Sequence, residues 1–391
     1  MRNPTKKAWV PACAGMTGLY FLILCIALAG CQRAPRTGLD FPDRFPDKLS
    51  DWHLVERHGD ALVPNRGVMV YDLNSPLFSD YAHKLRTVMV PAGTAIGFGA
   101  EDFEFPIGTV ITKTFYYANA DGKISGNTHA VRKVLQQAEG ETLPLRDVRL
   151  LETRLLIDTA SGWVALPYVW NESQTEATLE LTGAVLSLEL VSDIGRTSFA
   201  YIVPDTNQCA DCHSVDSKTQ ILKPIGVKAR HLNKDYRYAG SQENQLVHWS
   251  NAGLLKGAVA PAAAPRNAQW DLPSSGDVAA RARAYLDVNC GHCHSDRGAA
   301  NTSGLLLNAA ESDPARLGLC KIPVAAGRGA GNALFDIVPG APDESILLHR
   351  MQSTETDVAM PELGRSLIHE EGVALIRAWI GSLPGNCARS G

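Results

Sequence analysis

The 391-residue sequence predicts a multidomain β + α protein, in which an antiparallel β-sandwich-like N-terminal domain precedes a mainly α-helical domain. Three observations predict this class. Runs rich in β-branched and aromatic residues, separated by turn sequences, fill the region from about residue 51 to 204. Helix-period apolar patterns dominate only after residue 276. A short apolar stretch near the start is typical of an export signal.

The first thirty residues predict a secretory signal. Basic residues precede the apolar stretch Leu19–Ala29, which is shorter than the roughly 20 residues that a membrane-spanning helix needs. The stretch ends in Leu28-Ala29-Gly30-Cys31. This ending resembles the lipobox of bacterial lipoproteins, which implies cleavage before Cys31 and lipidation of its thiol. An ordinary signal peptide cut nearby is the alternative.

A lipidated chain would face the periplasm, anchored to a membrane through its lipid. Gln32, not Asp, follows the lipid cysteine, so the aspartate signal for inner-membrane retention is absent. Outer-membrane sorting is therefore favoured if the host has two membranes. The net charge of −4 falls to −7 once residues 1–30, with three basic and no acidic residues, are removed. This acidic balance argues against nucleic acid as a partner.

Four segments of the first half have strand composition, and no helix-period segment separates them. Parallel βαβ units are therefore not expected, and an antiparallel sandwich is. The segments are Thr109–Tyr117, Val148–Ile157, Trp163–Trp170 and Ala177–Val191. Later in the chain, Ser241–Leu255 predicts a helix, Asp277 can cap a helix that runs through Asn289, and a last helix is expected over His369–Leu383.

Two pentapeptides have the spacing of haem c attachment sites. Thiols three residues apart can form thioethers with the two vinyl groups of one haem, and the histidine that follows can reach the iron. The pentapeptides are Cys209-Ala210-Asp211-Cys212-His213 and Cys290-Gly291-His292-Cys293-His294. A four-cysteine zinc site would not need a histidine after each pair, and a thioredoxin-like pair requires a βαβ context that neither motif has.

The surroundings of the second motif resemble the small helical class I cytochrome c fold, because one helix precedes Cys290 and another closes the chain. His294 is the expected proximal ligand of the iron. Met360, followed by a proline, is the expected sixth ligand, and Met351 is its rival. Met351 lies in a predicted helix, where core packing is the usual role of methionine. His/Met ligation raises the reduction potential and is typical of an electron carrier.

The first motif has a less usual setting. His213 is its expected proximal ligand, but no methionine lies between His213 and the second motif. His248 is therefore the leading candidate for the sixth ligand, and His231 comes next. A methionine from another part of the chain, or an open iron, remains possible, and an open iron would suggest chemistry on a bound ligand.

Two cysteines remain after the signal, the lipid site and the haem motifs are subtracted. Cys320 and Cys387 both belong to the last region of an exported chain, so a disulfide between them is predicted. Two free thiols are the alternative.

Beyond the haem motifs, the chain resembles an uncharacterised family of exported dihaem c-type cytochromes. The segments that carry the resemblance are Tyr71–Arg86, Phe105–Tyr117, Leu166–Leu179, Ile225–Asn233, Asn244–Trp249, Ala284–His294, Val338–Met351 and Ala359–Leu367. The resemblance implies two covalent haem c groups, electron transfer, and proximal ligands at His213 and His294. Family members accompany a secreted parallel β-helix protein, which is a candidate partner. The resemblance does not extend to an enzyme activity.

The sequence therefore predicts an exported dihaem cytochrome that moves electrons between periplasmic or membrane-associated redox partners. A dihaem peroxidase-like enzyme and the electron-accepting subunit of a separate dehydrogenase are the alternatives. The predicted parts are a signal peptide at 1–30, a tether at 31–50, a β-rich domain at 51–204, a first haem c segment at 205–256, an Ala/Pro-rich linker at 257–275 and a second cytochrome c domain at 276–391.

Overall fold

The computed structural model describes residues 44–119, 129–132, 142–214, 216, 218–219 and 221–387. The predicted signal peptide, the lipidation site Cys31 and most of the predicted tether lie outside these residues. Leu39–Gly391 cluster into one compact unit. Within the described ranges, no helix combines the length and the apolar character needed to cross a bilayer.

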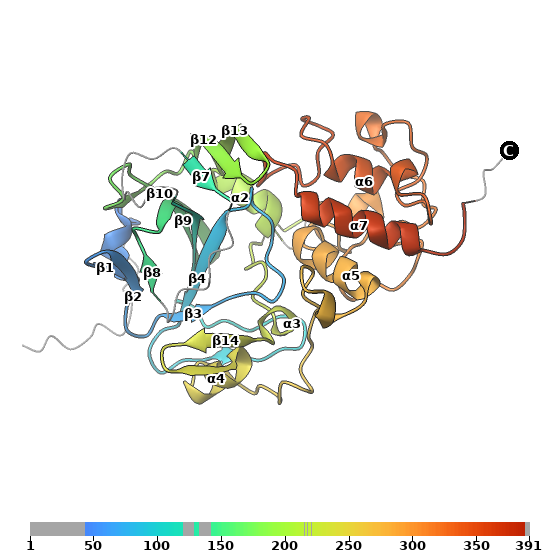
Figure 1. The fold of residues 1–391 in the computed structure, drawn as a ribbon. Helices are drawn as coiled ribbons and strands as arrows, with labels where there is room; N and C mark the ends of the chain where they lie inside the picture. The colour runs from blue at the N-terminus through green and yellow to red at the C-terminus, as the bar shows by residue number, and fades with distance from the viewer. Residues whose placement is uncertain are drawn as a thin grey trace, which may run out of the picture. The chain divides into compact units, whose positions relative to one another are not determined.

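A nine-stranded sheet forms the first half of the described chain (Figure 1). Its main path runs β11-β10-β9-β6-β7-β12-β13, and β4 also pairs with β6 and with β3. All pairs are antiparallel except β7 with β12. The strands are β3 (Met69–Tyr71), β4 (His83–Met89), β6 (Val110–Ala118), β7 (His129–Val131), β9 (Val148–Thr159), β10 (Gly162–Trp170), β11 (Ala177–Leu179), β12 (Ala184–Ser192) and β13 (Gly195–Val203).

Small sheets accompany the large one. The first has three strands, β1 (Val55–His58), β2 (Ala61–Pro64) and β8 (Leu143–Pro144), and follows the 3₁₀ turn η2 (Leu49–Trp52). Two more have two strands each: β5 (Ile96–Gly97) with β16 (Leu255–Lys256), and β14 (Asp235–Tyr238) with β15 (Ser241–Asn244). The expected antiparallel sandwich is thus one large sheet with smaller sheets beside it.

Both faces of the large sheet are covered, because successive residues of a strand point to opposite sides. On β6, Ile111 belongs to an apolar cluster that includes Trp249 from the later part of the chain. Its neighbour Val110 belongs to a separate cluster that includes Trp52 from the start of the described chain. Cover on both sides explains why β9 is buried along most of its length rather than on alternate residues only.

The helices are short. They are α2 (Thr206–His213), α3 (Ala229–Leu232), α4 (Gln245–Asn251), α5 (Val278–Asn289), α6 (Ile346–Met351) and α7 (Glu370–Ser382). The predicted cap of α5 is confirmed, since the Asp277 side chain accepts a hydrogen bond from the backbone N–H of Ala280. Helices α5 and α7 lie side by side (Figure 1) and share a core with α6, to which Leu286, Leu348 and Ile376 contribute.

The prediction of a mainly α-helical class I cytochrome c domain is wrong. The described chain has more strand (29%) than helix (21%, with the 3₁₀ segments included), and its six α-helices are short. The 3₁₀ segment η3 (Pro273–Ser275) precedes α5. After α5 the chain runs largely through turns and three more 3₁₀ segments, η4 (Asn301–Ser303), η5 (Gly327–Ala330) and η6 (Pro342–Glu344). The physical reason is local. Gly304 and Gly318 adopt positive φ angles, which a right-handed helix cannot include.

Buried hydrogen bonds connect the sheet region to the last region of the chain. The Asp80 carboxylate accepts from the backbone N–H groups of Ser366 and Leu367, at 2.8 and 2.7 Å. The backbone N–H of Phe78 donates to the Asn289 side chain at 2.8 Å, one residue before the second motif. These bonds hold the second motif in a defined position beside the loop that precedes β4.

Candidate functional site

The first motif occupies the helix that follows the edge strand β13. Asp205 caps this helix, α2, through a capping box with Gln208, so the helix begins at a defined residue after Pro204. Cys209 is buried, Cys212 is partly buried and the His213 ring is buried. The strand-then-helix order explains how an extended segment can lead directly into two thiols and a histidine on one short helix.

The second motif occupies the turn at the end of α5. The N–H of His294 donates to the carbonyl of Cys290 at 2.9 Å, which closes the turn. Cys290 packs against the core of the last region, where burial raises the pKa of its thiol to about 12. Thus one motif is carried by a helix on the sheet and the other by the C-terminal end of a helix.

The two motif histidines share one arrangement. His213 Nδ1 lies 2.8 Å from the carbonyl oxygen of Lys223, and His294 Nδ1 lies 3.0 Å from that of Leu305. With Nδ1–H donating to a carbonyl, each ring keeps Nε2 as the atom that can bind a metal. Burial lowers the pKa of His213 to about 3 and also lowers that of His294, so both rings are held in the neutral form that metal binding requires.

The two motifs meet although their second cysteines lie 81 residues apart in sequence. The thiol of Cys293 donates to the backbone oxygen of Asp211 at 3.9 Å. The side chains of Cys293 and His292 also form hydrogen bonds with the sulfur of Cys212, and these contacts lower the pKa of Cys212 below its usual value. Each motif therefore presents its second cysteine to the other motif.

A narrow cavity opens beside the first motif. Its volume is about 20 Å³. Its apolar lining includes Ile111, Leu156 and Ile225, and Cys209 and His213 form the side nearest the motif. The polar lining is cationic and consists of Arg86, Lys113 and Arg154. Sequence analysis missed these three residues. No pattern within one strand marks them, because β4 and β9 hold other basic residues and only the strand pairing brings the three together.

Neither histidine predicted as a sixth ligand lines this cavity. His248 Nδ1 lies 2.7 Å from the Glu243 carboxylate, and the ring stacks on Tyr238 with a centroid distance of 3.5 Å. His231 is buried, with Nε2 3.3 Å from Asp287, and burial lowers its pKa. Both rings thus have structural partners away from the cavity lining.

Met360 and its rival Met351 have different surroundings. Met351 is buried in the core of the last region, as its predicted helix suggested. Met360 is only partly buried, and its backbone oxygen accepts from Arg365 at 2.9 Å. The Arg365 charge acts on the thiol of Cys290, which places this segment in the neighbourhood of the second motif.

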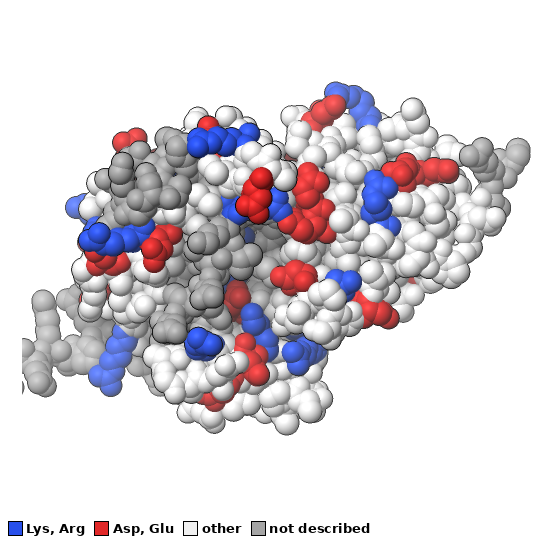
Figure 2. Space-filling view, in the orientation of Figure 1, with Lys and Arg blue, Asp and Glu red and all other residues white. Residues whose placement is uncertain are grey.

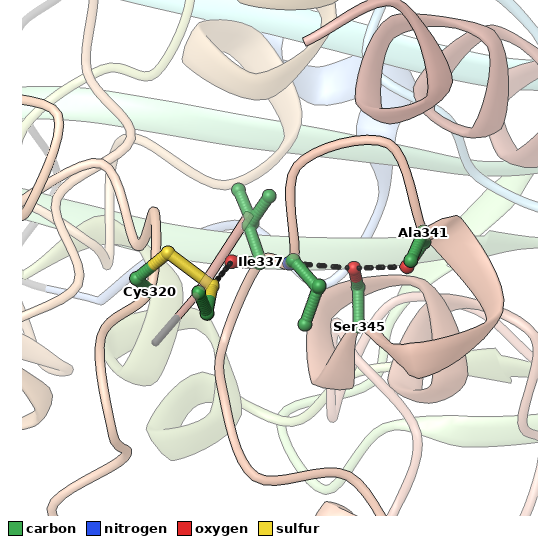
Figure 3. The surroundings of a disulfide bond; sticks show 6 residues. Cys320, Ile337, Ala341 and Ser345 are labelled. Carbon is green, nitrogen blue, oxygen red and sulfur yellow. Dashed lines mark hydrogen bonds between the residues drawn. A yellow bond between two sulfur atoms is a disulfide. The ribbon is translucent and has the colours of Figure 1, made fainter. Parts of the chain in front are cut away.

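A disulfide joins Cys320 to Cys387, 67 residues later (Figure 3). Both cysteines contact Ile337: its carbonyl accepts from the N–H of Cys320 at 2.9 Å and lies 4.0 Å from the sulfur of Cys387. The Ser345 hydroxyl stabilises the adjacent turn: it accepts from the N–H of Val338 at 2.9 Å and donates to the carbonyl of Ala341 at 3.1 Å. The disulfide therefore fastens the end of the described chain to the segment that precedes α6.

Among the described residues, no three or more His, Cys, Asp or Glu side chains gather as a metal-binding cluster. Figure 2 shows that acidic and basic side chains are interspersed over the face drawn, without a continuous field of one sign. The chain matches no protein-family model, no curated protein and no solved structure at a significant level.

Proposed function

We propose that this protein is an exported dihaem c-type cytochrome that relays electrons between redox partners. Cys209, Cys212 and His213 would hold one haem, and the other motif would hold the second. A bound haem c supplies an iron that takes up and releases one electron. The donor sets suit this group, since each combines two thiols at the required spacing with a neutral histidine whose Nε2 is available.

Covalent attachment would make the binding of each haem permanent. Each thiol would add across one vinyl group, so that its sulfur bonds to one carbon and its proton moves to the other, without net oxidation. His294 would bind the second iron from one side, with Met360 proposed for the other. The proposal leaves the sixth ligand of the first iron open, because neither His248 nor His231 lines the cavity beside His213.

The observation that carries the proposal is the contact between the motifs. Cys212 and Cys293 would each hold one haem by a thioether, so their contact would place the two attachment points next to each other. Neighbouring attachment points suit passage of an electron from one haem to the other. Two unrelated haem sites would have no reason to lie in contact.

The test is to purify the full chain from cells that mature c-type cytochromes, denature it and weigh it. We expect the mass of two haems, of one haem in Cys290→Ala/Cys293→Ala, and of one haem in Cys209→Ala/Cys212→Ala. Because these variants also remove buried groups, a haemochrome spectrum of each denatured sample gives an independent count. A colourless wild-type protein of unmodified mass would refute the proposal.

A peroxidase-like activity is the second candidate. The observation that favours it is the cavity that His213 lines, whose described lining is cationic and contains no methionine. Electron paramagnetic resonance of the oxidised protein separates the two functions. Two low-spin signals indicate a carrier, whereas a high-spin signal that changes on addition of peroxide indicates the enzyme.

Lipidation at Cys31 would place the relay at a membrane surface, facing the periplasm. Membrane quinol-linked donors are then within reach, and a secreted parallel β-helix protein is a candidate partner. Fractionation of cells that carry wild-type or Cys31→Ser protein tests the anchor: the variant should move from the membrane fraction to the soluble fraction.

A further inference from the structure

A row of three cations crosses the large sheet beside the first motif. Arg86 on β4 pairs in register with Lys113 on β6, and Lys113 pairs with Arg154 on β9. Residues directly opposite one another share a face of the sheet, and like charges at such positions destabilise it. Three adjacent cations in a partly buried row therefore require compensation by anions.

Two of the cations have carboxylate partners within the chain. Arg86 bonds to Asp72 at 2.7 Å, and Arg154 forms a two-point pair with Glu152 at 2.6 and 2.7 Å. The Glu152 carboxylate is shared with the hydroxyl of Tyr201 at 2.8 Å. These anions are thus already engaged by Arg86 and Arg154.

Lys113 has no such partner among the described residues. Its recorded contact is with the ring of Phe115, 5.5 Å from Nζ to the centroid. Lys84 makes an informative comparison, because it lies in the next row of the same face. Its Nζ donates to the backbone oxygens of Leu77 and Ala82, at 2.9 and 3.1 Å. The protein therefore provides hydrogen-bond acceptors for the partly buried ammonium of Lys84, whereas that of Lys113 faces the cavity.

The uncompensated positive charge lies at the cavity beside the first motif. Lys113, Arg86 and Arg154 line it together with Cys209 and His213, so the unpaired positive charge faces the first motif. We propose that the row Arg86–Lys113–Arg154 is a carboxylate-binding site, and that its ligand is a propionate of the haem attached to Cys209 and Cys212. This inference rests on the proposed function. It adds that charged residues of the sheet bind that haem and influence its reduction potential.

A haem propionate fits the site on two grounds. Attachment at Cys209, which shares this lining, would hold the haem beside the row, so the site would need no free ligand. It would also supply the anion that the buried row lacks, since an ammonium left unpaired at low dielectric is costly. A small carboxylate or phosphate from solution offers the same chemistry and is the other source.

The test uses the holoprotein and the variants Lys113→Met, Lys113→Gln and Lys113→Arg, with Lys84→Met as the matched buried-lysine control. Haem content is measured first by mass, which tests the proposed function separately. The two midpoint potentials are then measured by titration. We expect Lys113→Met and Lys113→Gln to lower one potential, because loss of a positive charge near the haem favours the ferric state. Lys113→Arg and Lys84→Met should leave both potentials near the wild-type values.

Three outcomes would overturn the inference. Unchanged potentials in both neutral variants, with two haems present, would show that Lys113 does not act on the haem. A wild-type potential that shifts on addition of formate or phosphate, while that of Lys113→Met does not, would assign the site to a solution anion. A changed axial-ligand absorption spectrum in the neutral variants and in Lys113→Arg alike would make Lys113 an iron ligand instead. Absence of haem in the wild type would refute the proposed function itself.

Discussion

Asp80 shows how much one side chain can contribute to the connection between distant parts of the chain. It is 2% exposed, and its carboxylate accepts the N–H groups of Ser366 and Leu367. Burial nevertheless dominates and raises its pKa to about 6, against the lowering effect of these hydrogen bonds. The folded chain therefore binds this proton more tightly than the unfolded chain does.

The sign of the pH effect follows. Because the pKa of Asp80 is raised from 3.8 to about 6, its contribution to stability is largest below pH 4 and declines as the pH rises to 6, by up to about 3 kcal/mol. Asp80→Asn should remove this decline. Urea unfolding at pH 4.5 and 6.5 measures it, with the exposed Asp193→Asn as control. An equal pH dependence in Asp80→Asn and wild type would contradict the assignment.

At the scale of elements, Asp287 joins α3, α5 and the loops beside them. It bonds to Arg230 at 2.8 Å, to His231 at 3.3 Å, to Asn267 at 2.8 Å and to the N–H of Ala309 at 2.8 Å. Burial would raise its pKa, but the hydrogen bonds and charges of His231 and Arg230 lower it below the usual range. The network thus holds the helix that leads into the second motif.

Loss of the Asp287 carboxylate should be costly, because Arg230 would remain buried with the exposed Glu101 as its one ionic partner among the residues that the structure describes. We expect Asp287→Ala to destabilise the protein by about 3–5 kcal/mol at pH 7, and Asp287→Asn by less, since the amide keeps one acceptor. The network's contribution should fade as the pH falls below 3.8. Urea midpoints of both variants test this, and a loss below about 1 kcal/mol for Asp287→Ala would contradict it.

Elements were predictable where local pattern and final environment agree. Strands β6, β9 and β10 lie within two residues of the predicted ranges, because their β-branched runs are also buried in the sheet. The helix predicted over Ser241–Leu255 is only α4, since its first residues pair with β14 and its last with β5. Such pairings join residues far apart in sequence, so no local pattern records them.

Residues of the candidate site also fall into two groups, those that a local sequence pattern predicts and those that it does not. The six motif residues follow from spacing alone, because covalent attachment demands that spacing. The carbonyls of Lys223 and Leu305 that orient the histidines could not be predicted from the sequence. Every residue has a carbonyl, and only the course of the loop in the fold decides which one lies next to the ring. The cationic row was equally hidden, because its members come from three strands that become neighbours only in the folded sheet.

At the scale of the whole molecule, the disulfide between Cys320 and Cys387 restrains the unfolded chain. It closes a loop of 67 residues, which corresponds to about 4 kcal/mol in the chain-entropy account. Cys320→Ser/Cys387→Ser should therefore unfold at lower urea concentration than wild type, by that free energy. Wild type measured in reductant should match the variant. A variant as stable as the oxidised wild type would show that the cross-link does not act through the unfolded state.

The depth of Cys209 has a consequence for the order in which the molecule is made. Cys209 is 6% exposed and lines the narrow cavity together with residues of the sheet. An enzyme that joins a prosthetic group to a thiol must first reach it, and the finished fold offers no access of that size. If a haem is attached at Cys209 as proposed, the attachment would have to precede closure of the fold over this thiol, on a chain that is still open.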